Sequence, residues 1–132
     1  MREPTWVSRK IVDALHPELI RQDGGSHGVR DDGMIDSALA RPVNRWSYES
    51  GCDLPELAAS YGYGLAKNHG FVDGNKRIAL AVMGVFLYTN GLLLEASEPE
   101  VVVLMTDLAA GELGETELAA WLREHVVPIT DE

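Results

Sequence analysis

Apolar residues recur at helical spacing near the start of the chain. The series Val7, Ile11, Leu15 and Leu19 advances four positions at a time. Side chains four positions apart share one face of a helix, so this spacing predicts a helix over residues 5–21. Thr5 is suited to be its N-cap. Pro17 either kinks this helix or begins a second short one, because proline cannot donate the helical hydrogen bond.

A polar stretch then interrupts the pattern. Residues 24–33 are rich in glycine and charged side chains, which predicts a loop or a short hairpin. A short helix is expected to begin near Met34 and to end before Pro42, because the residue that precedes a proline avoids helical geometry. Residues 44–53 show no periodicity and are expected to be irregular.

The rest of the chain returns to helical periodicity. The pattern and its capping signals predict helices over residues 54–68, 75–90, 97–110 and 116–125. Residues 78–88 are apolar on nearly every side, so we expect their helix to be buried on all faces. An extended link is expected at 92–96 and a tail at 126–132. The pattern therefore predicts an all-α fold of about six helices, with one glycine-rich excursion at residues 24–33.

Composition narrows the class of protein. The chain has 132 residues, 45% of them hydrophobic, which is typical of a single domain over residues 1–132. Its net charge of −10 argues against a nucleic-acid-binding face, which needs a basic stripe. Cys52 is the only cysteine, so no intrachain disulfide can form. No apolar run approaches the roughly 20 residues that span a bilayer, and we expect a cytoplasmic protein without a membrane partner.

The residues best suited to chemistry stand directly before the apolar helix, in the stretch 69–77. Lys76 and Arg77 fall in the first turn of the predicted helix, where the helix dipole disfavours cations. Their placement is understandable if an anion binds there. The backbone N–H groups of Gly74 and Asn75 are suited to bind a phosphate, as helix N-termini commonly do. The sequence therefore predicts a phosphate site beside a histidine and an aspartate.

The stretch 69–77 also resembles the signature of the Fic/Doc superfamily. It reads His-Gly-Phe-Val-Asp-Gly-Asn-Lys-Arg and matches the form found in the Doc (death-on-curing) toxin branch at every fixed position. Fic enzymes that transfer AMP usually carry proline in place of Gly70 and glycine in place of Lys76. Residues 24–42 are similar to the segment that carries the family's flap. The resemblance implies an all-α, single-domain Fic/Doc-like bundle with a glycine-rich flap.

The resemblance also implies roles for the signature residues. His69 would be the general base that takes a proton from a target hydroxyl, a task suited to a side chain with a pKa near neutrality. Asp73 would bind Mg²⁺, although an N-cap of the following helix is the structural alternative. The nucleotide phosphates would be held by Gly74, Asn75, Lys76 and Arg77. Ordinary turn chemistry and solvated surface cations are the alternatives for these four.

Structural interpretations are favoured for the remaining candidates. Phe71 is expected to be a core anchor that fixes the loop. Three histidines lie outside the signature: His16, His27 and His125. They are not flanked by other residues suited to catalysis, and we interpret them as side chains without a functional role. Residues 24–33 would be either an ordinary connection or the flap on which a target segment lies, held by backbone hydrogen bonds.

The resemblance implies an enzyme that uses ATP and Mg²⁺. Doc-type proteins are thought to move the terminal phosphate of ATP to a protein hydroxyl, with a translation elongation factor as the implied target, and so to arrest translation. Lys76 favours this kinase activity over AMP transfer, which is the near alternative. A non-catalytic module that only binds a partner is the alternative of another class. The chain contains no Ser/Thr-x-x-x-Glu-Gly/Asn silencing stretch, which implies a separate Phd-like antitoxin acting in trans.

Overall fold

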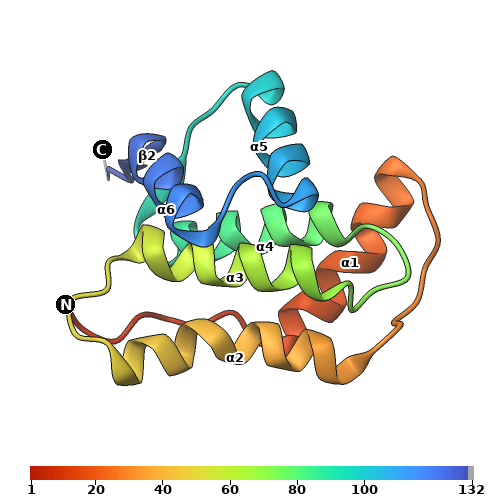
Figure 1. Ribbon diagram of the computed structural model, residues 1–132, viewed down its shortest axis with the longest axis horizontal. Helices are drawn as coiled ribbons and strands as arrows, with labels where there is room; N and C mark the ends of the chain where they lie inside the picture. The colour runs from red at the N-terminus through yellow and green to blue at the C-terminus, as the bar shows by residue number, and fades with distance from the viewer. Residues whose placement is uncertain (131–132) are drawn as a thin grey trace.

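The computed structural model describes residues 1–130 and arranges them as helices around a long central one (Figure 1). Within this range there are six helices and one two-stranded sheet. In chain order the elements are α1 (Arg9–Asp23), α2 (Asp32–Tyr48), α3 (Leu54–Asn68), α4 (Asn75–Thr89), β1 (Leu92–Leu94), α5 (Glu98–Ala110), α6 (Glu115–Glu124) and β2 (Val126–Pro128). The prediction of a mostly helical fold with about six helices is confirmed.

The central helix is α3, which lies between α2 and α4 in Figure 1. Ten of its 15 residues are buried. Gly64 lets α2 approach closely, because a Cβ at this position would lie 3.1 Å from the Cβ of Ala38. The hydroxyl of Tyr61 accepts a hydrogen bond of 2.9 Å from the backbone N–H of Val7, and burial raises the pKa of Tyr61 to about 12. This bond holds the segment before α1 against the core.

Helix α4 is less enclosed than its apolar sequence predicts. Ile78, Val82 and Phe86 on one face are fully buried. On the opposite face Leu80 is half-buried and Tyr88 is 63% exposed. The expectation that this helix is buried on all faces is therefore wrong. Helix α4 therefore carries more apolar residues than are buried by its packing against α3 and α1.

The start of the first helix also differs from the prediction. Thr5 is not the N-cap, because its backbone N–H donates to the side chain of Asn90 at the far end of α4. The cap is Ser8, whose Oγ accepts from the N–H of Ile11. Pro17 lies inside a helix that continues to Asp23, so the two alternatives left open by the sequence resolve into one helix.

Helix α2 continues past the proline that was expected to end it. It runs to Tyr48 with Pro42 buried inside it, so the predictions of a helix end before Pro42 and of irregular structure over 44–53 are wrong. Arg45, one turn after Pro42, makes ion pairs with Glu49 at 2.9 Å, with Glu56 of α3 at 2.9 Å and with Glu115 of α6 at 3.2 Å. Contacts with α3 and α6 therefore stabilise a helical stretch that the local sequence disfavours.

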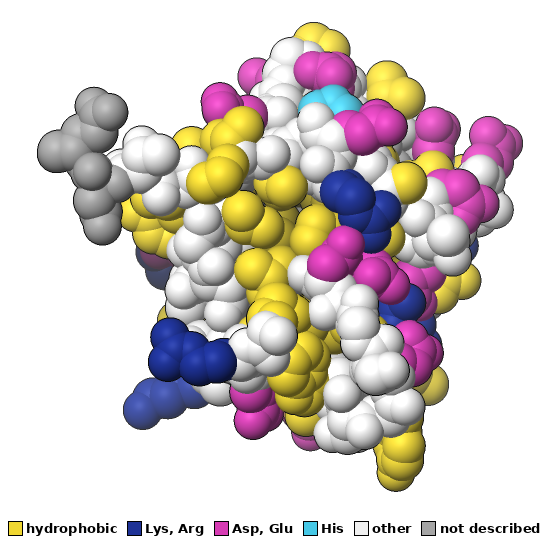
Figure 2. Space-filling view, turned by 90° about the vertical axis from the view of Figure 1, so that its left-hand side faces the viewer, with side chains coloured by type: hydrophobic (Ala, Val, Ile, Leu, Met, Phe, Trp, Pro, Cys, Tyr) yellow, Lys and Arg dark blue, Asp and Glu magenta, His cyan; other side chains and the backbone are white. Residues whose placement is uncertain are grey.

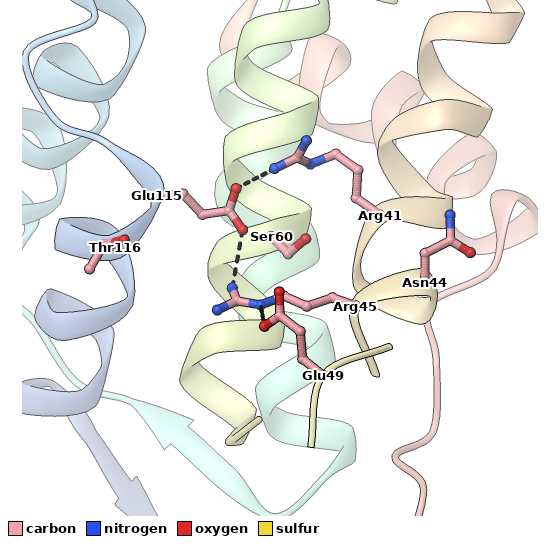
Figure 3. A pocket seen from close by; sticks show the side chains of 7 residues that line it. All are labelled: Arg41, Asn44, Arg45, Glu49, Ser60, Glu115 and Thr116. Carbon is pink, nitrogen blue, oxygen red and sulfur yellow. Dashed lines mark hydrogen bonds and ion pairs between the residues drawn. The ribbon is translucent and has the colours of Figure 1, made fainter. Parts of the chain in front are cut away.

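Figure 3 shows how these charges join three helices. Arg41 and Arg45 of α2 are both directed at the carboxylate of Glu115, which comes from α6. Ser60 of α3 lies beside them. The Arg45 side chain is only 24% exposed, so these pairs are partly shielded from water. Removing one partner of such a pair costs more than it does in a fully exposed pair, because the remaining charge is left partly shielded from water.

The chain after α6 is not only a tail. Residues 126–128 form β2, which pairs antiparallel with β1 in the register Leu92↔Pro128, Leu93↔Val127 and Leu94↔Val126. The predicted tail is therefore wrong for these residues, and residues 131–132 lie outside the described range.

Figure 2 shows the face of the molecule that lies at the left of Figure 1. Hydrophobic side chains run through the middle of this face, and acidic ones gather along its top and right. No helix within residues 1–130 is long and apolar enough to cross a membrane.

We expect Arg45→Met to lower the free energy of unfolding by roughly 1–2 kcal/mol, because it leaves the partly buried carboxylates of Glu56 in α3 and Glu115 in α6 without their common cation. Urea unfolding followed by circular dichroism measures the change. Arg21→Met is the matched control, because its partner Glu18 lies on an exposed helix surface, and we expect less than about 0.5 kcal/mol there. Equal effects of the two substitutions would contradict a special role for Arg45.

Candidate functional site

The signature stretch forms the loop between α3 and α4. At its start His69 takes a left-handed backbone conformation, with φ 49° and ψ 48°, which is uncommon for a residue with a side chain. The guanidinium group of Arg30 supports it, because Nε donates to the carbonyl of His69 at 2.6 Å and a terminal N–H donates to that of Asn68 at 3.2 Å. The backbone of His69 is thereby fixed while its side chain remains exposed.

The middle of the loop is closed by its own side chains. Asn75 Oδ1 accepts from the backbone N–H of Phe71 at 3.1 Å, and Asn75 Nδ2 donates to the carbonyl of Phe71 at 3.0 Å. The Phe71 ring is 3% exposed and stacks on the imidazole of His16 with 3.8 Å between ring centroids. Phe71 is therefore the core anchor that was predicted. Both polar atoms of the Asn75 side chain are thus bonded within the loop, so the backbone N–H of Asn75 is the group left to bind an anion.

Helix α4 begins with a glycine where a polar side chain usually stands. Gly74 is the N-cap, with φ 77°, and within residues 1–130 no side chain caps this helix. A Cβ at Gly74 would lie 3.0 Å from Ile20 Cδ1 of α1, so the close contact and the positive φ both require glycine. The alternative of Asp73 as the N-cap is therefore wrong. The N–H groups of the first turn of α4 stay available for another acceptor.

The carboxylate of Asp73 lies beside this helix start. Its Oδ2 accepts from the backbone N–H of Ser26 at 3.1 Å, and its Oδ1 accepts from that of Gly74 at 2.8 Å. The bonds from Ser26 and then Gly74 lower the pKa of Asp73 below its ordinary value of 3.8. The side chain is 48% exposed, so a charged and accessible carboxylate stands next to the free N–H groups.

The two cations of the signature have different surroundings. The guanidinium group of Arg77 donates to the carbonyl of Gly24 at 2.7 Å and lies 3.9 Å from the Asp73 carboxylate. Arg77 is thus placed at the C-terminal end of α1, where the helix dipole favours a cation. Its position does not by itself require an anion. Lys76 is exposed, and no ion pair is formed by it among residues 1–130.

All of the predicted site residues border one pocket of about 360 Å³. It is lined by Ala66, His69, Val72, Asp73, Gly74, Asn75, Lys76, Arg77 and Ala109. The pocket joins the start of α4 to the end of α3 and to the last turn of α5. It combines two cations, one carboxylate and one imidazole around a free helix N-terminus. This combination is suited to hold a phosphate chain beside a group that can accept a proton.

The glycine-rich segment 24–33 is attached to the signature loop. Val29 and Phe71 form an isolated antiparallel bridge, and the carbonyl of Gly70 accepts from the N–H of Arg30 at 2.8 Å. A hairpin is not formed within this segment, because its partner strand is the signature loop. Gly25 approaches Asp73 so closely that a Cβ there would lie 2.6 Å from Asp73 Oδ2. The segment therefore covers one side of the site.

Two residues that contact the loop were not predicted from the sequence. His16, interpreted as an ordinary side chain, is 3% exposed and has its Nε2 atom 2.7 Å from the carbonyl of Asp73. Its position four residues after Val12 and four before Ile20 places it on the buried face of α1, which is a signal for a structural role. Arg30 gave no such signal, because it lies in a segment without periodicity.

The structure is thus that of a helical protein whose pocket, at the start of a helix, holds two cations, a carboxylate and an imidazole. Residues 6–87 match the Fic/DOC family, and the chain belongs to that family. A relative from Escherichia phage P1 named Protein kinase doc is 36% identical over 117 residues, which are 89% of this chain and 92% of that one. Toxin Doc from Mycolicibacterium smegmatis is 43% identical over 74 residues, 55% of this chain and 57% of its own.

We expect Gly25→Ala to raise the pKa of Asp73 towards 3.8, because the added Cβ displaces the segment and breaks the bond from Ser26 N–H. A carbon-13 NMR titration of the Asp73 carboxyl measures this pKa. Because the folded-state pKa lies below the unfolded value, the stability contribution of Asp73 is present above about 3.9 and is lost as the pH falls through the folded-state pKa.

Ser26→Ala is the matched control for this titration. It removes only the hydroxyl and keeps the backbone N–H that donates to Asp73, so the pKa should stay at its wild-type value. An unchanged pKa in Gly25→Ala would mean that the flap contact does not hold the carboxylate in its charged form.

Proposed function

We propose that the chain is the toxin of a toxin–antitoxin pair and that it acts as an ATP-dependent protein kinase of the Doc type. Residues 1–132 would form one Doc/Fic-like domain. The observation that carries the proposal is the pocket at the start of α4, which gathers His69 and residues 73–77 around uncapped helix N–H groups. The names of the two relatives, a protein kinase and a toxin, support it.

In the proposed reaction the γ-phosphate of ATP moves to a hydroxyl group of a target protein. His69 accepts the hydroxyl proton as the oxygen attacks the γ-phosphorus. A new P–O bond forms to the target, and the bond from the γ-phosphorus to the β–γ bridging oxygen breaks. ADP leaves with that electron pair. The exposure of His69 at the pocket edge fits a base that meets a hydroxyl from a second protein.

The residues of the pocket fit ATP with Mg²⁺. One carboxylate together with substrate phosphates is a usual set of Mg²⁺ ligands, and Asp73 is charged and 48% exposed. Bound Mg²⁺ would neutralise part of the phosphate charge. Gly74 would let the backbone come close to the phosphates, its own N–H being bonded to Asp73, and Asn75 would offer its backbone N–H. Lys76 and Arg77 would supply positive charge. A phosphate would therefore meet donors on several sides.

The proposal includes two protein partners and a location. A Phd-like antitoxin would bind in trans and silence the toxin. The target would be a translation elongation factor, so that its phosphorylation arrests translation. The cytoplasm would be the place of action, in keeping with the single Cys52, which is buried and whose pKa is raised by burial.

AMP transfer with the opposite orientation of ATP is the second candidate. Two residues favour the kinase. Lys76 stands where AMP-transferring Fic enzymes usually carry glycine, and it projects a charge at the pocket edge. Gly70 stands where they carry proline, and a Cβ at this position would lie 2.4 Å from Ile35 Cγ1 of α2. The loop of this chain is therefore packed against α2 in a way that excludes a larger residue. A non-catalytic partner-binding module remains the third candidate.

The test supplies cell extract with Mg²⁺ and with ATP labelled separately at the γ- and α-phosphates. We expect a protein band labelled only from the γ-label, and a loss of about 10²–10⁴-fold in rate for His69→Ala, because the base is removed. Labelling from the α-phosphate would identify an AMP transferase instead. The absence of any labelled band, together with no binding of Mg·ATP, would favour the partner-binding module.

We expect Lys76→Met to weaken the binding of Mg·ATP about tenfold, because a charged contact to a phosphate is lost. Isothermal titration calorimetry measures the dissociation constant. Lys10→Met is the control, because it removes the same charge from the exposed side of α1, away from the pocket. A comparable weakening in both variants would mean that only the net charge matters and that Lys76 does not contact the nucleotide.

A further inference from the structure

We infer that His16 is a positioning residue that sets the orientation of the peptide between Asp73 and Gly74. The inference rests on the proposed function, since it concerns the same phosphate pocket. His16 comes from α1, 57 positions before Asp73 in the chain, and it is 3% exposed. Its Nε2 atom lies 2.7 Å from the carbonyl oxygen of Asp73. A buried polar contact of this length to a site residue calls for a role beyond filling space.

The contact fixes which imidazole nitrogen carries the proton. A carbonyl oxygen can only accept a hydrogen bond, so Nε2 must be the protonated nitrogen, and the tautomer is assigned from this partner. The ring is held in place by its stacking on Phe71, with an interplanar angle of 12°. His16 therefore presents a rigid donor to the Asp73 carbonyl from the side of α1.

The planarity of the peptide bond carries this effect into the pocket. In a trans peptide the carbonyl of one residue and the N–H of the next point in opposite directions. With the Asp73 carbonyl held by His16, the N–H of Gly74 must point away from α1. It donates there to Asp73 Oδ1 at 2.8 Å, on the side where the pocket lies. The hydrogen bond from His16 on the buried side thus determines that the N–H end of this peptide dipole, and not its carbonyl end, is directed towards the pocket.

Without the N–H donor of His16, we expect the peptide between Asp73 and Gly74 to rotate. Gly74 has φ 77° and no side chain, and glycine permits both orientations at little steric cost. A rotated peptide would point the Asp73 carbonyl oxygen into the pocket and repel a phosphate. The Asp73 carbonyl, if it stayed in place, would lose its hydrogen bond to the buried His16 side chain.

Two substitutions of His16 separate its donor from its ring. His16→Gln keeps an N–H donor at about the position of Nε2 and loses the ring. His16→Phe keeps the ring that stacks on Phe71 and loses the donor. Melting temperatures of both are measured first, and His16→Leu replaces the phenylalanine variant if the larger ring prevents folding. If only the packing matters, His16→Phe should behave as wild type and His16→Gln should not.

The first readout needs no nucleotide. Proton–nitrogen NMR of the ligand-free protein follows the backbone amides of Gly74 and Ser26, which both donate to the Asp73 carboxylate. We expect both amide signals at wild-type positions in His16→Gln and clearly displaced in His16→Phe. The second readout is the dissociation constant of Mg·ATP, which we expect to rise at least about tenfold in His16→Phe and less than about threefold in His16→Gln.

The outcomes are distinct. Wild-type amide signals and wild-type binding in His16→Phe would overturn the inference. Displaced signals and weakened binding in both variants alike would show that an N–H donor at this position does not hold the peptide, and would overturn it as well. If the wild-type chain itself fails to bind Mg·ATP, the proposed function fails. The amide signals, and their response to inorganic phosphate, then still decide whether His16 orients the peptide.

Discussion

The first turn of α4 is held in one place although no side chain within residues 1–130 caps its N–H groups. A polar side chain at the N-cap would fix the turn but would occupy its N–H groups. In this chain the N-cap is Gly74, and the fixation comes from outside the turn. The Asn75 side chain bonds both polar groups of the Phe71 backbone, and His16 contacts the carbonyl of Asp73. The position of α1 and the path of the flap both depend on this arrangement.

Residues 24–33, which the resemblance predicts to be the flap, are therefore linked to the site by hydrogen bonds. Arg77 leaves the first turn of α4 and bonds the carbonyl of Gly24, where α1 ends and the flap begins. Two residues later Ser26 donates to Asp73, and further along Arg30 bonds the carbonyl of His69. A movement of the flap would change the environment of the proposed base and of the proposed metal ligand together.

Local sequence was sufficient for elements whose signals are local. The capping boxes of α3 and α5 mark where these helices begin, and the glycine after α4 marks where that helix ends. The site residues are neighbours in the chain. It failed where distant contacts decide. Pro42 stays helical because α2 is held by pairs such as Arg45–Glu115, 70 positions apart. The role of His16 depends on a contact 57 positions away, which no periodicity within α1 could reveal.

The structure also divides the signature into two kinds of residue. The side chains of Phe71, Asn75 and Arg77 are engaged with the loop, the core or the end of α1, so they would be needed even without a ligand. His69 and Lys76 are exposed at the pocket. The dipole-opposed position of Arg77 has a structural cause, whereas that of Lys76 has no such cause among residues 1–130. Of the two residues proposed to favour phosphate over AMP transfer, Gly70 is packed against Ile35 of α2, whereas the Lys76 side chain is exposed at the pocket.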